Sequence, residues 1–243
     1  MYDWKTLKVL GLVLLCLPVA HLAYLTVQMR QTLANPAPEV WQDQLQEIID
    51  GDQGLSLPAA PIVATGGLSV RLWKDLPAVI AERPTLLRPL GGASIEDLTH
   101  HYNRLIGYYR PSVLIVMPSY EELHLRNPKS PEALVGALRG LLERNIGLAV
   151  TSRRYVVMPI KTLRHPSDGP RIDAMTEVSQ ALARSLPLTS VLDPNPLLAG
   201  EDGAPNPDYF GIDGINLNED GYAQLSGLLR RTLIEDRMIS GAI

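Results

Sequence analysis

Two patterns of apolar residues divide the chain. Near the N-terminus, Val9 to Val27 carries no formal charge and is about long enough to cross a bilayer, which takes roughly 20 apolar residues. Beyond this run, short apolar stretches alternate with segments in which apolar residues recur at helical spacing. The chain is therefore predicted to hold one N-terminal membrane helix followed by a globular α/β domain.

The apolar run can be interpreted as an uncleaved anchor or as a cleaved signal peptide. The two candidate cleavage sites place Pro18 or His21 where a small residue is wanted. Cys16 follows Leu15, whereas a lipidation site would need a small residue there. We therefore favour an uncleaved transmembrane helix, which acts as a signal anchor in contact with membrane lipid.

Basic residues lie asymmetrically around this helix. Lys5, Lys8 and the amino terminus precede it, and only Arg30 follows closely. The positive-inside rule then predicts a cytoplasmic N-terminus and a main domain outside. We expect a single-pass protein of a bacterial inner membrane, whose main domain would be periplasmic. The expected regions are a cytoplasmic segment at 1–8, the anchor at 9–29, a linker with a short helix at 30–60, and one domain at 61–243.

The elements of the domain follow from the period of its apolar residues. Strands are predicted over residues 61–65, 85–89, 112–117, 155–160 and 189–192. Helices are predicted over residues 39–50, 69–81, 94–109, 130–149, 172–184 and 219–236. Ser94 followed by Asp97 indicates a capping box. The alternation of strand and helix favours a three-layer α/β/α, flavodoxin-like fold with about five parallel strands. Ligands of such folds bind beyond the carboxyl ends of the strands.

Composition narrows the classes of function. Hydrophobic residues make up 46% and charged residues 20% of the chain, as in a globular protein. The net charge is -4 without a basic run, so nothing points to nucleic acid. The single cysteine, Cys16, lies in the apolar run, which excludes a disulfide, a thiolate metal site and a cysteine nucleophile in the domain. No metal and no cofactor is predicted.

Four loops that follow predicted strands carry recognisable motifs. They read GGLSVRLW at 66–73, LRPLGG at 87–92, MPSYE at 117–121 and DGINLNEDGY at 213–222. In order and spacing they resemble the conserved blocks of the SGNH (GDSL-type) hydrolases, in the branch that reads G-S-S-S-I-R-x-W. The resemblance extends over residues 61 to about 235. It implies the SGNH-hydrolase form of the flavodoxin-like fold and the hydrolysis of acyl esters.

The same resemblance implies which residues should do the chemistry. In that family a serine attacks the carbonyl, and a histidine oriented by an aspartate is the general base. A glycine N–H and an asparagine side chain help to hold the oxyanion. These positions are held here by Leu68 (nucleophile), Asn216 (base), Asp213 (aspartate), Gly92 (glycine) and Tyr120 (asparagine). Leucine has no nucleophilic atom and an amide takes no proton near neutral pH, so a catalytically degenerate member, a pseudoenzyme, is predicted.

Other polar residues offer substitutes or alternatives. Ser69 is the fallback nucleophile, although a helix N-cap is the favoured role. His124 is the best-placed substitute base, although a solvated loop histidine is favoured. Glu121 and Glu122 form an acidic pair for which a structural role is favoured. The remaining polar candidates are two helical surface histidines (His100 and His101), a loop histidine without an evident partner (His165), and solvated loop acids (Asp193, Glu201, Asp202 and Asp208).

Three functions fit these residues. The first is an extracytoplasmic accessory or structural subunit of a membrane complex or of envelope assembly, with a membrane-protein partner. The second is a divergent serine esterase that uses Ser69 on acyl esters of the envelope. The third is a module that binds an acyl or glycan ligand in a cleft lined by Leu68 and Tyr120.

Overall fold

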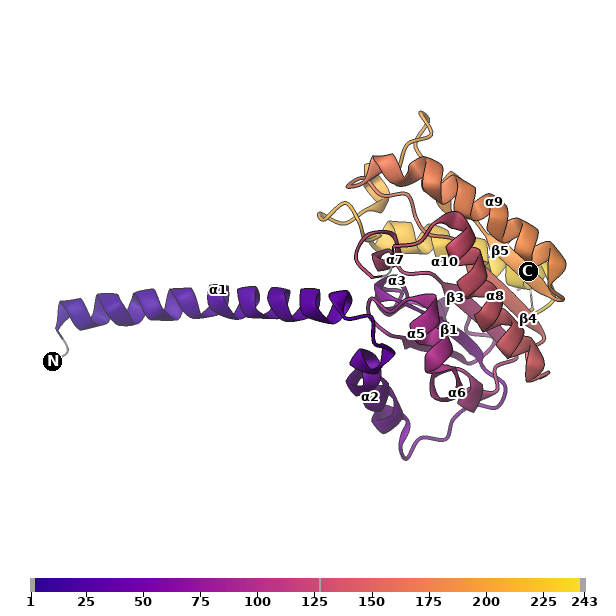
Figure 1. Ribbon diagram of the computed structural model, residues 1–243, viewed down its shortest axis with the longest axis horizontal. Coiled ribbons are helices and arrows are strands. Elements are labelled where there is room, and N and C mark those ends of the chain that lie inside the picture. The colour runs from indigo at the N-terminus through magenta and orange to yellow at the C-terminus, as the bar shows by residue number, and fades with distance from the viewer. Residues whose placement is uncertain (1–2, 127, 241–243) are drawn as a thin grey trace.

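The computed structural model describes residues 3–126 and 128–240. A long helix, α1 (Trp4–Ala34), projects from an α/β domain (Figure 1). In the described residues α1 is the one helix long and apolar enough to cross a membrane, and none of its most apolar window is buried. An N-terminal helix of this kind is either a membrane anchor or a signal sequence.

The domain is built on a single parallel sheet. Its strands are β1 (Ile62–Gly66), β2 (Thr85–Pro89), β3 (Val113–Met117), β4 (Arg153–Val157) and β5 (Thr189–Leu192). They lie in the order β2-β1-β3-β4-β5, and every neighbouring pair is parallel. The predicted α/β fold with five parallel strands is therefore confirmed.

Helices cover both faces of this sheet (Figure 1). The longer ones are α8 (Pro131–Gly147), α9 (Gly169–Ser185) and α10 (Glu219–Glu235). The shorter ones are α3 (Leu68–Leu72), α4 (Leu76–Val79), α5 (Ile95–His100), α6 (Tyr102–Leu105) and α7 (Glu121–His124). Successive strand residues point to opposite faces: Leu114 belongs to the core beneath α5, α8 and α9, whereas Ile115 belongs to the core beneath α3, α4 and α10.

Two predicted helices are interrupted in the structure. The segment predicted as one helix over 69–81 forms α3 and α4, because Pro77 lacks an N–H for a continuing helix and instead lies in the first turn of a new one. The segment predicted over 94–109 forms α5, α6 and a 3-10 turn (Gly107–Tyr109). The predicted Ser94–Asp97 capping box is present at the start of α5.

Strand β4 lies slightly earlier in the chain than the predicted strand over 155–160. It begins with two arginines whose guanidinium groups have polar partners in other parts of the chain. The Arg153 guanidinium lies 2.8 Å from Asp236, and Arg154 donates to Asn145 over 2.6 Å. Because the prediction followed apolar residues alone, it missed this polar beginning of the strand.

The segment between α1 and β1 was expected to be a linker with a short helix at 30–60, and the structure shows it packed on the domain. It forms a 3-10 turn (Pro38–Trp41) and α2 (Gln42–Asp52). Trp41 and Leu45 are buried in the core, and Asp52 pairs with Arg88 of β2 at 2.7 Å. The apolar face of this short helix therefore has the domain as its partner.

Candidate functional site

The motif loops converge at the carboxyl edge of the sheet. Leu90 donates its N–H to the Gly66 carbonyl over 2.9 Å, which joins the loop after β2 to the end of β1. A Cβ on Gly67 would lie 2.6 Å from the Cβ of Ser119 and 3.4 Å from the Gly92 nitrogen. Glycine at 67 is therefore required by the close approach of three loops.

Leu68 is the first residue of α3 and is partly buried. Gly67 is the N-cap of this helix, so the expected N-cap role of Ser69 is wrong. The helix begins one residue earlier than predicted, and Ser69 lies inside it. The Ser69 carbonyl accepts the Tyr222 hydroxyl over 2.8 Å, which ties α3 to α10. A leucine at the start of this helix provides no group that could attack a carbonyl.

Gly92 lies in a loop that the end of α1 and the chain after it cover. Its φ is +89°, and an added Cβ would lie 2.6 Å from Leu33 Cδ2 and 3.5 Å from Trp41. The neighbouring Gly91 N–H donates to Gln44 Oε1 over 2.9 Å. The glycine that resembles an oxyanion donor is thus needed here for close packing against the chain that follows α1.

The aromatic rings of Tyr120, His124 and His165 form a cluster. The Tyr120 ring centroid lies 4.9 Å from that of His124 and 5.8 Å from that of His165, and the two imidazoles are 4.6 Å apart. His124 Nε2 lies 2.6 Å from Asp168 Oδ2. His124 is therefore not a solvated loop histidine, and His165 has partners. Sequence spacing gave no signal for this cluster because its members come from the loops after β3 and β4.

The charges around this cluster affect the phenol. Burial, together with the carboxylates of Asp168 and Glu121, raises the pKa of Tyr120 to about 12 against the opposing charge of Arg164. The phenol is thus protonated at neutral pH. It can donate a hydrogen bond to a ligand, but it does not reproduce the amide of the family's asparagine.

Asp213 and Asn216 form a pair of their own. The Asn216 amide donates to Asp213 Oδ2 over 2.6 Å, and Asp213 Oδ1 accepts the N–H groups of Ile215 and Asn216, both over 2.9 Å. Burial acts to raise the pKa of Asp213, but these hydrogen bonds outweigh it and hold that pKa below its usual range. The carboxylate therefore braces its own loop, and the amide it orients is not a base.

Four of the acidic candidates have structural partners. The Ser119 hydroxyl donates to Glu121, and buried Glu122 lies 2.9 Å from Lys129 Nζ. Asp193 and Asp202 each accept a backbone N–H two residues further along the chain, the geometry of Asx turns. In the part of the chain that the structure describes, no three His, Cys, Asp or Glu side chains are grouped as metal ligands.

One of the two helical histidines also differs from the expectation. His101 is buried, and its Nε2 lies 2.8 Å from the Pro38 carbonyl. It ends α5 and precedes α6, so it is not a surface residue in the middle of a helix. His100 is exposed, as expected, and lies 3.8 Å from Glu39.

Comparison with known proteins concerns the fold. No protein-family model and no curated protein matches the chain. Among solved structures, a GDSL-like lipase from Bacteroides thetaiotaomicron is 14% identical, with a TM-score of 0.65 over 79% of this chain and 98% of that chain. A Bacteroides fragilis protein assigned as an acylhydrolase is 16% identical, with a TM-score of 0.67 over 79% and 96%.

A carbohydrate esterase of family 3 from Talaromyces cellulolyticus is also similar, at 11% identity and a TM-score of 0.55 over 72% of this chain and 96% of that chain. Each of these similarities covers nearly the whole of the matched chain. The fold implied by the sequence motifs is therefore confirmed, and it is the fold of GDSL-type hydrolases.

Proposed function

We propose that this chain is a membrane-anchored protein that uses the SGNH-hydrolase fold without its hydrolytic chemistry, as an extracytoplasmic accessory subunit of a membrane complex or of envelope assembly. The observation that carries the proposal is the pair of substitutions at the reacting positions. Leu68 lies where the nucleophile is expected, and Asn216 is paired with Asp213 where a histidine is expected.

Losing both groups removes the covalent route altogether. Without a nucleophile no acyl-enzyme forms, and without a base no proton is taken from a serine or a water. The loop of Gly92, the glycine at the family's oxyanion position, supports the same conclusion, because Leu33 covers it. At the carboxyl edge of the sheet, the family's reacting positions hold the apolar side chain of Leu68, the phenol of Tyr120 and the amide of Asn216. These groups suit ligand binding better than catalysis.

The apolar surface of α1 supports the location. A span over 9–29 with Lys5 and Lys8 before it agrees with a cytoplasmic N-terminus and a domain on the outer side of the inner membrane. A single span can also contact the helices of a membrane-protein partner.

One observation favours a second candidate, a divergent esterase. His124 and Asp168 form a His–carboxylate contact at the same edge of the sheet as Ser69, and such a pair can activate a serine. If this pair served as the base, Ser69 would be the nucleophile and the substrates would be acyl esters of the envelope.

Turnover of short-chain nitrophenyl esters by the full-length protein in mild detergent tests the proposal. We expect no turnover above a Ser69→Ala control. A revertant that carries Leu68→Ser, Tyr120→Asn and Asn216→His shows whether the scaffold still accepts an ester. Hydrolysis by the natural chain that disappears in both Ser69→Ala and His124→Gln would establish the esterase instead.

A further inference from the structure

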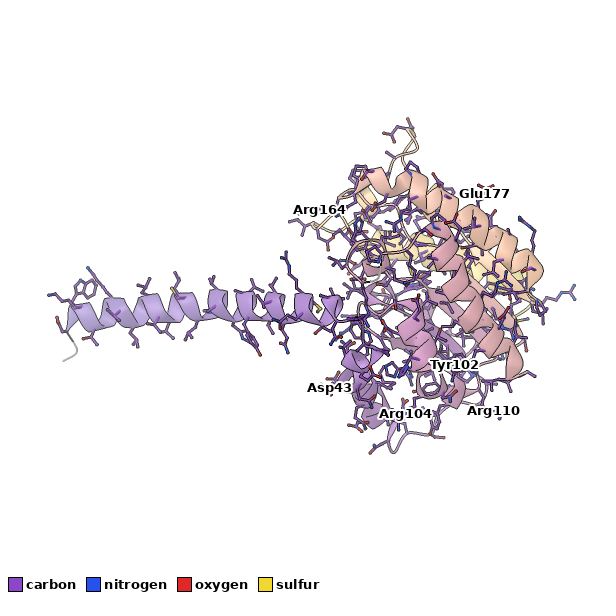
Figure 2. The ribbon with its side chains drawn as sticks, viewed as in Figure 1. Asp43, Tyr102, Arg104, Arg110, Arg164 and Glu177 are labelled. Atoms are coloured by element: carbon purple, nitrogen blue, oxygen red, sulfur yellow. The ribbon has the colours of Figure 1, made fainter. Side chains whose placement is uncertain are left out.

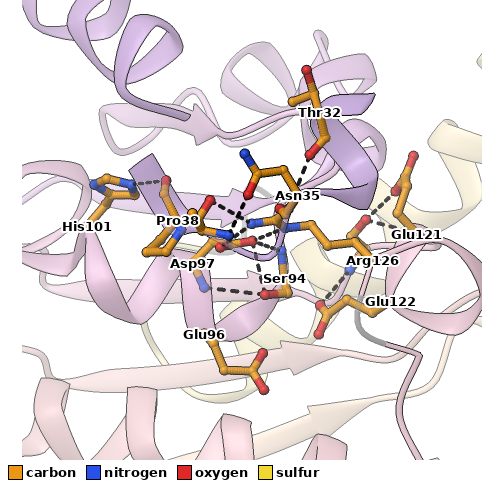
Figure 3. A network of polar contacts seen from close by, with 12 residues as sticks. Thr32, Asn35, Pro38, Ser94, Glu96, Asp97, His101, Glu121, Glu122 and Arg126 are labelled. Carbon is orange, nitrogen blue, oxygen red and sulfur yellow. Dashed lines mark hydrogen bonds and ion pairs between the residues drawn. The ribbon is translucent and has the colours of Figure 1, made fainter. Parts of the chain in front are cut away.

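The end of α1 is tied to the domain by one buried arginine. Arg126, at the end of the loop after β3, is 2% exposed. Its guanidinium binds Asp97 through Nε–Oδ2 at 2.5 Å and Nη2–Oδ1 at 2.7 Å (Figure 3). The remaining N–H groups donate to the backbone carbonyls of Thr32, Asn35 and Ala37. The last carbonyls of a helix need such donors, and here a domain residue provides them.

We call the contacts of Arg126 with Asp97, Thr32, Asn35 and Ala37 the Arg126 joint. Contacts on both sides of the turn that follows α1 reinforce it. Leu33 of α1 is nearly buried and lies against Gly92. The ring of Trp41 is fully buried beside the Arg126 guanidinium, 5.3 Å from it. Contacts before and after the turn therefore restrain both the position and the direction of α1 relative to the domain.

These contacts place one edge of the domain near the membrane. Gly92 follows β2 and Arg126 follows β3, so α1 reaches the carboxyl edge of the parallel sheet. The apolar run ends at Val27, and the helix continues to Ala34, about 10 Å further at 1.5 Å per residue. The headgroup layer is roughly 5–8 Å thick on each side of the hydrocarbon, so the sheet edge lies close to the bilayer surface.

The loops of this edge carry exposed side chains that suit a lipid interface. Ile212 is fully exposed in the loop before Asp213, and Leu125, next to Arg126, is 53% exposed. Arg164 is also exposed, and its backbone N–H donates to the Gly214 carbonyl over 3.0 Å, which places Arg164 beside the Ile212 loop. In Figure 1 loops of the domain extend alongside the end of α1, and Figure 2 shows Arg164 on that side.

We propose that the carboxyl edge of the sheet lies on the surface of the membrane that α1 crosses. Leu125 and Ile212 enter the interfacial layer and the Arg164 guanidinium binds lipid phosphate, the contacts expected of an interfacial surface. The loops of Leu68, Tyr120 and Asn216 then open toward lipid headgroups. This inference shares the membrane anchoring of α1 with the proposed function, but it does not depend on whether the site hydrolyses esters, so ester hydrolysis would overturn the proposed function and leave the orientation standing.

A depth measurement with the full-length protein in nanodiscs tests this orientation. The nanodiscs contain phosphatidylcholine and phosphatidylglycerol, with or without brominated acyl chains. In a Cys16→Ala background, Ile212→Cys is labelled with an environment-sensitive fluorophore. The matched control is Leu188→Cys, since Leu188 is 55% exposed and precedes β5 at the opposite edge of the sheet. We expect brominated lipid to quench the label at 212 severalfold more than the label at 188. Equal quenching at both positions, or none at 212, would overturn the proposal.

A second variant moves the domain away from the membrane and leaves the Arg126 joint unchanged. A seven-residue helical insertion after Met29 leaves every contact of Arg126 in place and adds about 10 Å and nearly two whole turns to α1. We expect the quenching at 212 to fall to the level of the control at 188. Quenching that survives the insertion contradicts the rigid placement of the domain by α1.

Discussion

The Arg126 joint and the Asp213–Asn216 loop lie at the same edge of the sheet, yet they use their polar groups differently. Arg126 and Asp97 are buried, and their charges and N–H groups are satisfied by three segments of the chain. Asp213 is exposed and bonds only within its own loop among the described contacts. The Arg126 joint is thus expected to support the folded state, whereas the Asp213–Asn216 loop should tolerate change.

The largest effect is expected from Arg126→Ala. The substitution leaves the Asp97 carboxylate buried without its cation and removes the donors from three backbone carbonyls. Breaking a buried pair of this kind costs about 3–5 kcal/mol. Denaturant unfolding of the full-length protein in detergent measures the loss, and Arg139→Ala in an exposed i,i+4 pair is the control. If Arg126→Ala lowers the free energy of unfolding no more than this control does, the Arg126 joint does not stabilise the fold.

A smaller effect, dependent on pH, is expected from Asp97→Asn. Burial acts to raise the pKa of Asp97, but Arg126 and Ser94 outweigh it and hold that pKa below its usual range. A depressed pKa stabilises the fold at pH values above the unfolded-state pKa of about 3.9, and this stabilisation is lost as the pH falls through the folded-state pKa. We expect Asp97→Asn to cost about 1.5–3 kcal/mol at pH 7.

The difference between the natural chain and Asp97→Asn then shrinks in acid. Unfolding titrations at pH 7 and at the lowest pH where both chains fold measure this difference. A difference that stays constant across that range would mean that the Asp97 charge does not contribute to the joint.

Gly92→Ala should lower the free energy of unfolding by about 1–3 kcal/mol, the usual cost of overpacking, because it disturbs the contact between the Gly92 loop and α1. The added Cβ would lie 2.6 Å from Leu33, and φ at this position is +89°. Gly140→Ala in α8 is the matched control, because its Cβ would meet nothing within 4 Å, and it should stabilise slightly. Thermal unfolding of both variants compares them directly, and equal shifts would show that Leu33 does not hold this loop.

The smallest effect is expected from Asp213→Ala. The carboxylate is exposed, and its hydrogen bonds serve one turn, so the cost should lie below about 1 kcal/mol. The same unfolding measurement checks it. A cost as large as that of Arg126→Ala would show that the Asp213–Asn216 loop contributes to stability as much as the Arg126 joint does.

Much of the fold followed from local pattern, because buried strands and capped helices are local features. The run that became β3 is apolar along its whole length, and β1, β2 and β5 each hold at least two adjacent apolar residues. The Ser94–Asp97 capping box can be predicted from two residues alone. The start of β4 was missed because Arg153 is paired with Asp236, which lies 83 residues away. Local pattern carries no information about such a partner.

The residues of the candidate site could be predicted only at positions that belong to one of the family motifs. Leu68, Gly92 and Asn216 were found through the order of the motif loops. The second role of Gly92, as a contact for Leu33, was missed because it links the loop to a residue of α1. The ring cluster of Tyr120, His124 and His165 and the joint of Arg126 were missed for the same reason, since each joins separate segments of the chain.

The most direct test of the proposed loss of hydrolytic chemistry is the intact mass of the full-length protein after exposure to a fluorophosphonate. This reagent forms a phosphonyl ester with an activated serine, and fluoride leaves. The account predicts an unchanged mass in the folded natural chain and one added phosphonyl group in the Leu68→Ser, Tyr120→Asn, Asn216→His revertant. One phosphonyl group on the natural chain that maps to Ser69 would contradict the account and identify a working serine hydrolase.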